Sequence, residues 1–318
     1  MSDINAAGVR PVILCNGFDK KPWPVSFAHS SASFAQSSTQ DSLFSITLKR
    51  VSDRTRYAAP IIVAHIEHIF FILADLKRMD INDAIIFLEP EARHNSAAVI
   101  ISALSEHLED MLHLILPADH IMEQEEDFHN AVSHAAAAAG MTNFVLFGTP
   151  AANADSHHSY IVPGQNVQDG PLCKVGVFTE RADETFARVL ISQGGLWDSG
   201  MTLYDPRLLC EEAAMLAPGQ FIQCQKALDH AQHERKCILL RAEDYADMEN
   251  RSLGTLLLEH TQHCLVLPCH SKWLRAQASE FIEPANRNTN LHDSIAVKDS
   301  YILSEGVFIT AFGWESAS

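Results

Sequence analysis

The stretch PVILCNG, residues 11–17, determines how the rest of the chain is interpreted. Its first part, Pro11 to Cys15, is apolar throughout, which is typical of a strand buried on both faces of a sheet. Similar runs follow at intervals along the first half of the chain, and we predict strands there too. These runs are Pro60 to Ala64, Ala84 to Leu88, Met111 to Leu116 and Asn143 to Phe147.

The stretches between these runs have the apolar periodicity of helices. Asp41 is placed to cap a helix that runs to Val51, because a carboxylate accepts hydrogen bonds from the first backbone N–H groups. A second helix is predicted from Glu123 to Ala139, with acidic residues in its first turn and Gly140 after its last residue. Buried strands joined by helices predict an α/β fold with a mostly parallel central sheet.

Ligands of such sheets bind where the strands end at their carboxyl edge. The segments to inspect for function therefore follow Leu14, Leu88 and Leu116.

After Gly148 the pattern changes, and polar loops alternate with strands and helices. We predict strands at Cys173 to Thr179 and Leu196 to Tyr204, and helices at Pro206 to Leu216 and Phe221 to Glu234. From Asn288 onward, short apolar pieces separated by turn residues predict a small β appendage. The expected organisation is a main domain over residues 1–285 and an appendage over 286–318, which could serve dimerisation.

Composition narrows the classes of function. The chain has 318 residues, 47% of them hydrophobic, and a formal net charge of -17. This charge argues against nucleic acid or an anionic membrane as a partner, since both repel it. Seven cysteines without a CxxC pair predict reduced thiols and a cytoplasmic protein. The most apolar long segment, Ala58 to Leu76, contains too many charged and histidine side chains to cross a bilayer, and no signal peptide follows Met1.

Several motifs, in order between about residues 11 and 273, resemble those of the bacterial mannose-1-phosphate guanylyltransferases. Any one of them is weak, but together they keep the order and spacing of that family. They are VILCNGFDKKPWPVSF (12–27), LEPEARHNSAA (88–98), LPADH (116–120), HHSYI (157–161), FTERA (178–182), WDSGMT (197–202) and AEDYADME (242–249).

The resemblance implies a Rossmann-like nucleotidyltransferase fold of the GT-A type. It also implies a reaction in which mannose 1-phosphate attacks the α-phosphate of GTP, giving GDP-mannose and pyrophosphate for polysaccharide biosynthesis, with Mg²⁺ as cofactor. The matching positions are Lys21 and Arg93 for catalysis; Cys15, Asn16, Gly17 and Lys20 for the nucleotide; Tyr160, Glu180, Arg181 and Asp198 for the sugar phosphate; and Asp119 for the metal.

The chain departs from the family pattern where phosphates and metal are handled. Asn16 and Asp19 replace glycines of the phosphate loop, and a like charge at about 4 Å from a phosphate costs about 4 kcal/mol. Lys21 stands in place of the loop arginine, while Ala32 replaces a lysine. The second metal-binding aspartate aligns with Cys269, and a thiolate is a poor ligand for a hard cation. These losses predict impaired guanylyl transfer.

The sugar side is better kept, because Glu180 and Asp198 retain acceptor oxygens and Arg181 retains a cation. His157 and His158, however, bring two rings to positions held by a small residue and a tyrosine, and we expect them to fill part of the pocket.

Structural interpretations remain open beside the functional ones. Lys20 and Lys21 could be solvated loop lysines, Asp119 could cap a helix, and Arg93 could be an ion-pair partner at a helix start. One further group has the residue types of a zinc site, although strand cysteines and surface histidines are commoner. Its members are His260, His263, Cys264, Cys269 and His270.

Three hypotheses follow. The first is an active sugar-nucleotide transferase with a remodelled site. The second is a non-catalytic pseudoenzyme or regulatory subunit that binds a nucleotide sugar or an active paralogue. The third is a structural interaction module that uses the appendage. A homodimer, or a heteromer with an active paralogue, is expected from the resemblance.

Overall fold

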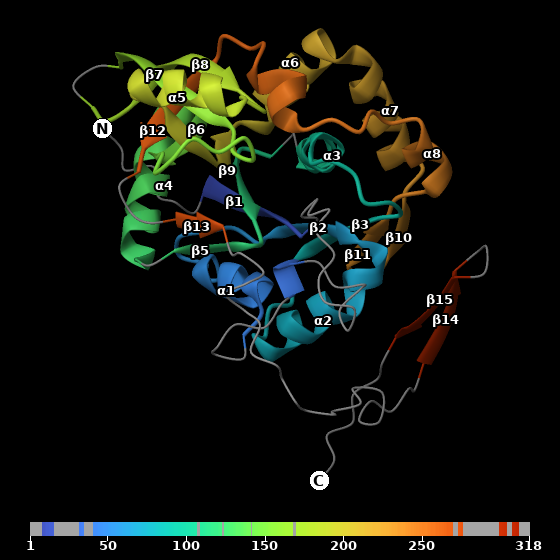
Figure 1. Ribbon diagram of the computed structural model, residues 1–318. Helices are drawn as coiled ribbons and strands as arrows, with labels where there is room; N and C mark the ends of the chain where they lie inside the picture. The colour runs from blue at the N-terminus through green and yellow to red at the C-terminus, as the bar shows by residue number, and fades with distance from the viewer. Residues whose placement is uncertain are drawn as a thin grey trace. The chain divides into compact units, whose positions relative to one another are not determined.

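The computed structural model describes residues 8–15, 32–34, 41–106, 109–122, 124–140, 142–167, 170–269, 273–275, 299–303 and 307–311. The chain divides into two compact units, Met1–Phe281 and Ile282–Ser318. The first unit contains the large sheet and the helices that cover it (Figure 1). Among the described residues, no helix combines the length and the apolar character that a membrane crossing requires.

The strands of the first unit range from buried and apolar ones such as β1 and β6 to the exposed, polar β10. They are β1 (Val9–Leu14), β2 (Ile61–His65), β3 (Ile85–Glu89), β4 (Leu112–Pro117), β5 (His120–Met122), β6 (Phe144–Pro150), β7 (Tyr160–Asn166), β8 (Cys173–Thr179), β9 (Leu196–Tyr204), β10 (Gln232–Glu234), β11 (Cys237–Leu239), β12 (Cys264–Pro268) and β13 (Trp273–Arg275).

The central sheet has the strand order β10-β11-β3-β2-β1-β4-β9-β6-β12-β8-β7, and β5 pairs separately with β13. Its pairs from β11 to β4 are parallel, as is the pair β6–β12. Antiparallel pairing enters with β9, which lies between β4 and β6, and with β7, β8 and β10. The α/β class with a central sheet is confirmed, and the sheet itself is mixed.

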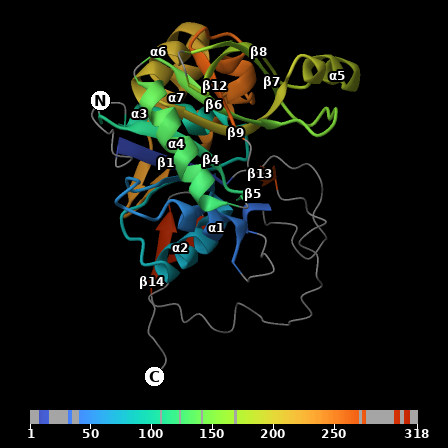
Figure 2. The ribbon, with the colours of Figure 1, turned by 90° about the vertical axis from the view of Figure 1, so that its left-hand side faces the viewer.

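The helices are α1 (Leu43–Arg50), α2 (Ile69–Arg78), α3 (Ser96–Glu106), α4 (Glu125–Ala139), α5 (Glu184–Ser192), α6 (Pro206–Leu216), α7 (Pro218–Asp229) and α8 (Ala242–Ala246), with a π-helical turn at Gly254–Leu258. Two views at right angles place α1 and α2 on one face of the parallel strands, and α3, α6 and α7 on the other (Figures 1 and 2). This layering explains why these strands are mostly apolar.

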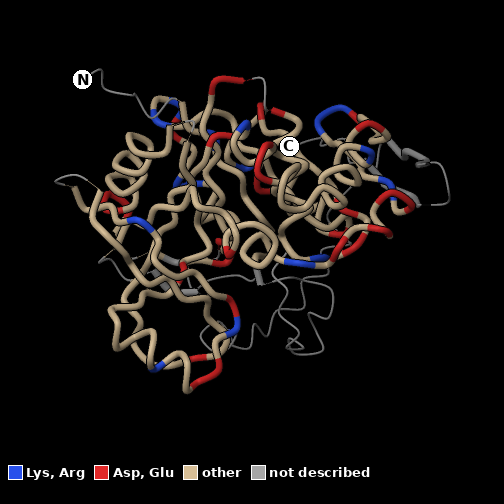
Figure 3. The backbone as a smooth tube through the Cα atoms, turned by 90° about the horizontal axis from the view of Figure 1, so that it is seen from above, with Lys and Arg blue, Asp and Glu red and all other residues tan. Residues whose placement is uncertain are grey.

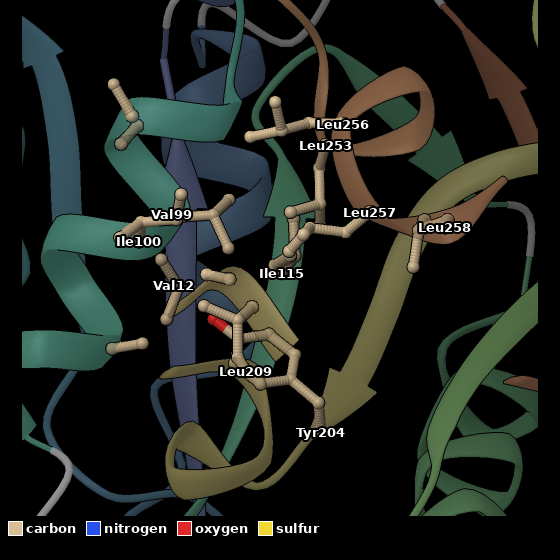
Figure 4. Packing of buried hydrophobic residues seen from close by; sticks show 14 of the residues in the cluster. Val12, Val99, Ile100, Ile115, Tyr204, Leu209, Leu253, Leu256, Leu257 and Leu258 are labelled. Carbon is tan, nitrogen blue, oxygen red and sulfur yellow. The ribbon is translucent and has the colours of Figure 1, made fainter. Parts of the chain in front are cut away.

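The main core lies between the parallel strands and the helices of the second face. Val12 of β1 and Ile115 of β4 point toward Val99 and Ile100 of α3, while Leu209 of α6 packs nearby (Figure 4). Leucines of the π-helical turn close the same core, so the segment after α8 is anchored by burial of apolar surface.

The strand predictions of the first half are confirmed to within a few residues, but two details of the helices were wrong. The cap of α1 is Ser42, whose hydroxyl accepts from the Ser45 N–H at 3.0 Å, while Asp41 binds Arg78. The helix predicted to reach Glu234 ends at Asp229. The segment after it forms the hairpin of β10 and β11, and its turn places Arg235 at a φ of 53°.

The second unit contains an antiparallel hairpin of β14 (Asp299–Leu303) and β15 (Val307–Ala311). This hairpin falls in the segment where the sequence predicts a β appendage.

Candidate functional site

The order of the parallel strands creates a place for a ligand. From β1 the chain passes to β2 and β3 on one side and then returns to β4 on the other side of β1. The segments that follow β1 and β4 therefore diverge at the carboxyl edge, which is where open α/β sheets bind ligands. A hydrogen bond from the Ala118 N–H to the Leu14 carbonyl, at 3.0 Å, marks the point of divergence.

Cys15, Asp119 and Glu89 lie at this edge. Cys15 is fully buried, and Asp119 and Glu89 are 5% and 1% exposed. Burial raises the pKa of the Cys15 thiol well above its usual value, and the nearby carboxylates of Asp119 and Glu89 raise it further. The thiol is therefore neutral, which leaves Asp119 and Glu89 as the acidic groups of this region.

A second acidic region is formed by Glu180 and Asp198. Thr179 directly precedes Glu180, and Trp197 directly precedes Asp198. Thr179 and Trp197 both pair with Tyr160 of β7, one from each side. The Asp198 N–H continues this pairing, donating to the Ser159 carbonyl at 2.8 Å. The two carboxylates thus belong to the same row of the sheet.

The environment of this pair disfavours charge. Burial raises the pKa of Asp198 to about 7, the Gly200 N–H that it accepts lowers it, and Glu180 raises it again. The pKa of Glu180 is raised by burial, against the lowering effect of its hydrogen bond from Ser252. A ligand that donates hydrogen bonds to both carboxylates would replace the water they lack.

The π-helical segment holds Glu180 in place. The Ser252 hydroxyl donates to one carboxylate oxygen at 2.6 Å, and the other lies against the Cα of Gly254. A Cβ at position 254 would collide with the Glu180 carboxylate and lie 3.0 Å from the Phe178 ring. Only glycine leaves this carboxylate where it is.

We therefore expect Gly254→Ala to displace Glu180 and to weaken binding of a sugar ligand about tenfold, the loss of one to two hydrogen bonds. Calorimetric titration with GDP-mannose measures the effect. Gly219→Ala is the matched control, because a Cβ there would meet nothing within 4 Å. Equal affinities for the two variants would show that the position of Glu180 does not matter for binding.

Arg93 binds the protein's own backbone. Its guanidinium donates to the Met248 carbonyl at 2.6 Å, to the Ala246 carbonyl at 3.1 Å and to Glu91 at 3.0 Å. It also lies 5.8 Å from the centre of the Tyr245 ring. These contacts support the ion-pair interpretation of Arg93. They leave few of its guanidinium N–H groups for a nucleotide.

Two other predicted sugar-phosphate residues have different surroundings. Tyr160 is fully buried, and its hydroxyl accepts from the Asp155 N–H at 2.8 Å and donates to the Asp155 carbonyl at 2.9 Å. Arg181 is exposed at a φ of 60°, directly after Glu180. Tyr160 therefore shapes the loop before β7, while Arg181 is placed to meet an anion from solvent.

The two histidines expected in the pocket differ in exposure. His158 stacks on the Trp197 ring at 4.2 Å, next to Asp198 in the chain. His157 is 80% exposed and interacts with Asp155 at 2.8 Å. The predicted nucleotide and catalytic residues Asn16, Gly17, Lys20 and Lys21 lie outside the described residues, as does Asp19.

Few of the predicted side chains could act as ligands of a cation. Asp119 is a buried carboxylate, 3.8 Å from the Nε2 atom of His120. Cys269 follows β12, and its N–H donates to the Gly148 carbonyl at 2.7 Å. Burial raises the pKa of the Cys269 thiol to about 12, so it is neutral and unsuited to Mg²⁺.

Within the described ranges, no group of three or more His, Cys, Asp or Glu side chains is placed to hold a metal ion. This applies to His260, His263, Cys264 and Cys269, while His270 lies outside the described residues. Mg²⁺ commonly takes one or two carboxylates and completes its shell with phosphate oxygens and water. The Asp119 carboxylate fits that mode as a single protein ligand.

Sequence reasoning missed the residues that position the loop after β3. The Tyr245 hydroxyl donates to the buried Glu89 carboxylate, and the Asn95 side chain accepts from the Leu253 N–H at 2.9 Å. The Ser96 hydroxyl donates to the Arg251 carbonyl at 2.6 Å. The sequence signal for these contacts was that the segments 88–98 and 242–249 both match motifs of the family. In the structure the two segments are in contact.

Acidic and basic positions are interspersed along the described chain (Figure 3). The local charge that matters for a ligand is therefore that of the carboxyl edge.

Comparison with known proteins adds independent information. The sequence profile described as "Nucleotidyl transferase" matches residues 10–249. The alginate biosynthesis protein AlgA of Pseudomonas aeruginosa is 30% identical, over 96% of this chain and 66% of its own length. The mannose-1-phosphate guanylyltransferase RfbM of Salmonella typhimurium is 28% identical, over 95% of this chain and 65% of its own length. This chain thus spans about two thirds of the length of these curated relatives.

Solved structures share the fold. They include mannose-6-phosphate isomerase from Helicobacter pylori, with a TM-score of 0.72 and 21% identity over 84% of this chain and 99% of the other. Another is mannose-1-phosphate geranyltransferase from Thermus thermophilus, with a TM-score of 0.71 and 20% identity over 84% of this chain and 76% of the other. At such identities the likeness concerns the fold alone.

Proposed function

The chain belongs to the nucleotidyl transferase family, and from this premise we propose that it binds a sugar phosphate and a nucleoside triphosphate at the carboxyl edge of its sheet. Mannose 1-phosphate and GTP are the pair we propose, because the relatives include a mannose-1-phosphate guanylyltransferase. Relatives named for alginate and xanthan biosynthesis support a place in polysaccharide biosynthesis. The seven free cysteines support a reducing compartment such as the cytoplasm.

One observation carries this proposal: Glu180 and Asp198 lie in one row of the sheet, both short of water. Sugar hydroxyls donate hydrogen bonds, and a pair of carboxylate groups with unfilled acceptor positions suits them. The polar groups of a sugar would satisfy the two acidic side chains without requiring a large pocket.

The proposed reaction forms one bond and breaks one. An oxygen of the sugar phosphate attacks the α-phosphorus of the triphosphate, and the bond from that phosphorus to the oxygen bridging to the β-phosphate breaks, so pyrophosphate leaves. Such transfer depends on positioning and charge neutralisation. Asp119 would hold Mg²⁺, which neutralises phosphate charge when bound. Glu180 and Asp198 would orient the sugar.

We propose that this transfer is slow. Cys269 offers a neutral thiol at the position that aligns with a metal-binding aspartate, and the Arg93 fork is taken up by backbone carbonyls. The same two observations favour a second candidate function, a non-catalytic subunit that binds a nucleotide sugar, either as a homodimer or with an active paralogue.

Cys269→Asp is expected to raise the rate of GDP-mannose formation about tenfold at saturating Mg²⁺, because it returns a hard, charged ligand to the edge. The measurement is pyrophosphate release from GTP and mannose 1-phosphate. Cys269→Asn is the matched control, since it adds polarity without charge.

If both variants turn over at the same rate, the thiol is not what limits the reaction. If neither variant nor the natural protein turns over while GDP-mannose still binds, the non-catalytic candidate is the correct one.

A further inference from the structure

The segment 246–259 touches two parts of the carboxyl edge that are far apart in sequence. Its first half contacts the loop after β3, which contains Arg93, and its second half contacts Glu180. The motif that contains Arg93 suggests a nucleotide clamp. The contacts instead connect Arg93 with the carboxylate that we propose to orient the sugar.

The loop holds the first half of this segment through four consecutive residues, 93–96. Each of them makes at least one hydrogen bond to the segment, at distances from 2.6 to 3.1 Å. The bonds join Arg93 to the Ala246 and Met248 carbonyls, the His94 N–H to the Asn250 side chain, the Asn95 side chain to the Leu253 N–H, and the Ser96 hydroxyl to the Arg251 carbonyl. Most of these partners are backbone atoms, so the bonds fix the path of the segment.

The second half of the segment holds Glu180 by its side chain and by its backbone. The Ser252 hydroxyl donates to the carboxylate, and Gly254 lies against it. The Glu180 N–H donates to the Glu259 carboxylate at 2.9 Å. Leu253, whose N–H is bound by Asn95, stands between Ser252 and Gly254 in the chain. The backbone that the loop fixes is therefore the backbone that presents both contacts to Glu180.

Apolar packing alone does not set this position. Leu253, Leu256 and Leu257 lie in the same buried cluster as Val99 of α3 (Figure 4). Burial of apolar surface keeps the π-helical turn against α3, but it is not directional. The hydrogen bonds from residues 93–96 are directional, so they determine where Ser252 and Gly254 lie.

We propose that Arg93 and Asn95 are positioning residues for Glu180 and determine affinity for the sugar, a role that rests on the proposed function because Glu180 must itself bind the sugar. When either side chain is removed, the segment shifts. The Ser252 hydroxyl and Gly254 then no longer hold the carboxylate in one orientation. The nucleotide, which neither side chain contacts in this scheme, is bound as before.

The test is calorimetric titration with mannose 1-phosphate and, separately, with GTP and Mg²⁺. Arg93→Met is expected to weaken mannose 1-phosphate binding about tenfold and Asn95→Ala about fivefold, while GTP affinity changes by less than about twofold. Asn95→Asp keeps the acceptor oxygen and should retain most of the sugar affinity. Arg241→Met is the matched control for removing an arginine, because Arg241 binds the exposed Glu243 instead of backbone carbonyls.

A second comparison separates positioning from a general loss of stability. In a Glu180→Gln background, Asn95→Ala should have almost no further effect on mannose 1-phosphate binding, because residues that act through one contact are not additive. Asn95→Ala also decides the test if Arg93→Met does not fold, since water can replace the lost acceptor at this half-buried position.

The outcomes distinguish this role from the proposed function. If the natural protein does not bind mannose 1-phosphate, the proposed function fails and the positioning role fails with it. If the natural protein binds it and Asn95→Ala binds it equally well, the positioning role alone is wrong. Equal losses in the two backgrounds, or a larger loss for GTP than for mannose 1-phosphate, would also overturn it.

Discussion

Replacing His113 by leucine is expected to reduce the protein's sensitivity to acid. His113 lies in β4, opposite Arg10 of β1 and Tyr204 of β9, and is fully buried. Neither ring nitrogen has a hydrogen-bond partner among the described residues. Burial lowers the pKa of His113 to about 3, Arg10 lowers it too, and Asp205 opposes them.

The sign of the effect follows from proton binding. In the unfolded chain the imidazole takes up a proton below pH 6.5, whereas in the folded protein it does so only near pH 3. Acid therefore favours the unfolded state, and folding stability is lost as pH falls from 6.5 toward 3. The full difference corresponds to about 5 kcal/mol of unfolding free energy.

Denaturant unfolding of the natural protein and of His113→Leu between pH 8 and pH 4 measures this. We expect the gap in favour of the leucine variant to widen as pH falls. At pH 8 the variant should already be more stable by about 1 kcal/mol or more, because an unsatisfied polar ring is gone. Two parallel pH profiles would contradict the assignment of acid sensitivity to His113.

Asp198→Asn is expected to have the opposite pH dependence. Its folded pKa of about 7 lies above the ordinary value of 3.8, because burial and the neighbouring Glu180 disfavour its charge. The contribution of the protonated carboxyl is fully present below pH 3.8 and is lost as pH rises through 7. The loss is about 4 kcal/mol at most, and the partial exposure of the side chain makes it smaller.

Asparagine keeps the shape and an acceptor oxygen but cannot ionise. The variant should match the natural protein at pH 4 and exceed it at pH 8, as measured by urea unfolding at both pH values. Glu184→Gln, on the exposed face of α5, is the control for removing one negative charge from the same region. If the control gains as much as Asp198→Asn at pH 8, the effect is one of net charge and not of the partly buried pair.

Much of the fold was predictable because burial leaves a strong pattern in sequence. The run from Pro11 to Cys15 is apolar at every position, as expected for a strand covered on both faces, and β1 lies between its parallel neighbours β2 and β4. The hairpin of β10 and β11 was missed because its residues continue the polar pattern of α7. The turn at Arg235, with its positive φ, separates β10 from β11.

The candidate site was predictable where motifs lie at strand ends and unpredictable where it depends on long-range contacts. Asp119 and Asp198 follow directly from the positions of their motifs. The support of Glu180 by Ser252 and Gly254 joins residues more than seventy positions apart, and no local pattern encodes it. Arg93 shows the reverse, since its motif suggests a nucleotide clamp and its contacts are with backbone carbonyls.

The central claim is that the carboxyl edge binds a nucleotide sugar through its partly buried acidic pair, Glu180 and Asp198. The most direct measurement is calorimetric titration of the natural protein and of Glu180→Gln with GDP-mannose, with circular dichroism to confirm that both are folded. The account predicts saturable binding by the natural protein and affinity at least about tenfold weaker for the variant. Absence of binding by the natural protein, or equal affinity of the two folded proteins, would contradict it.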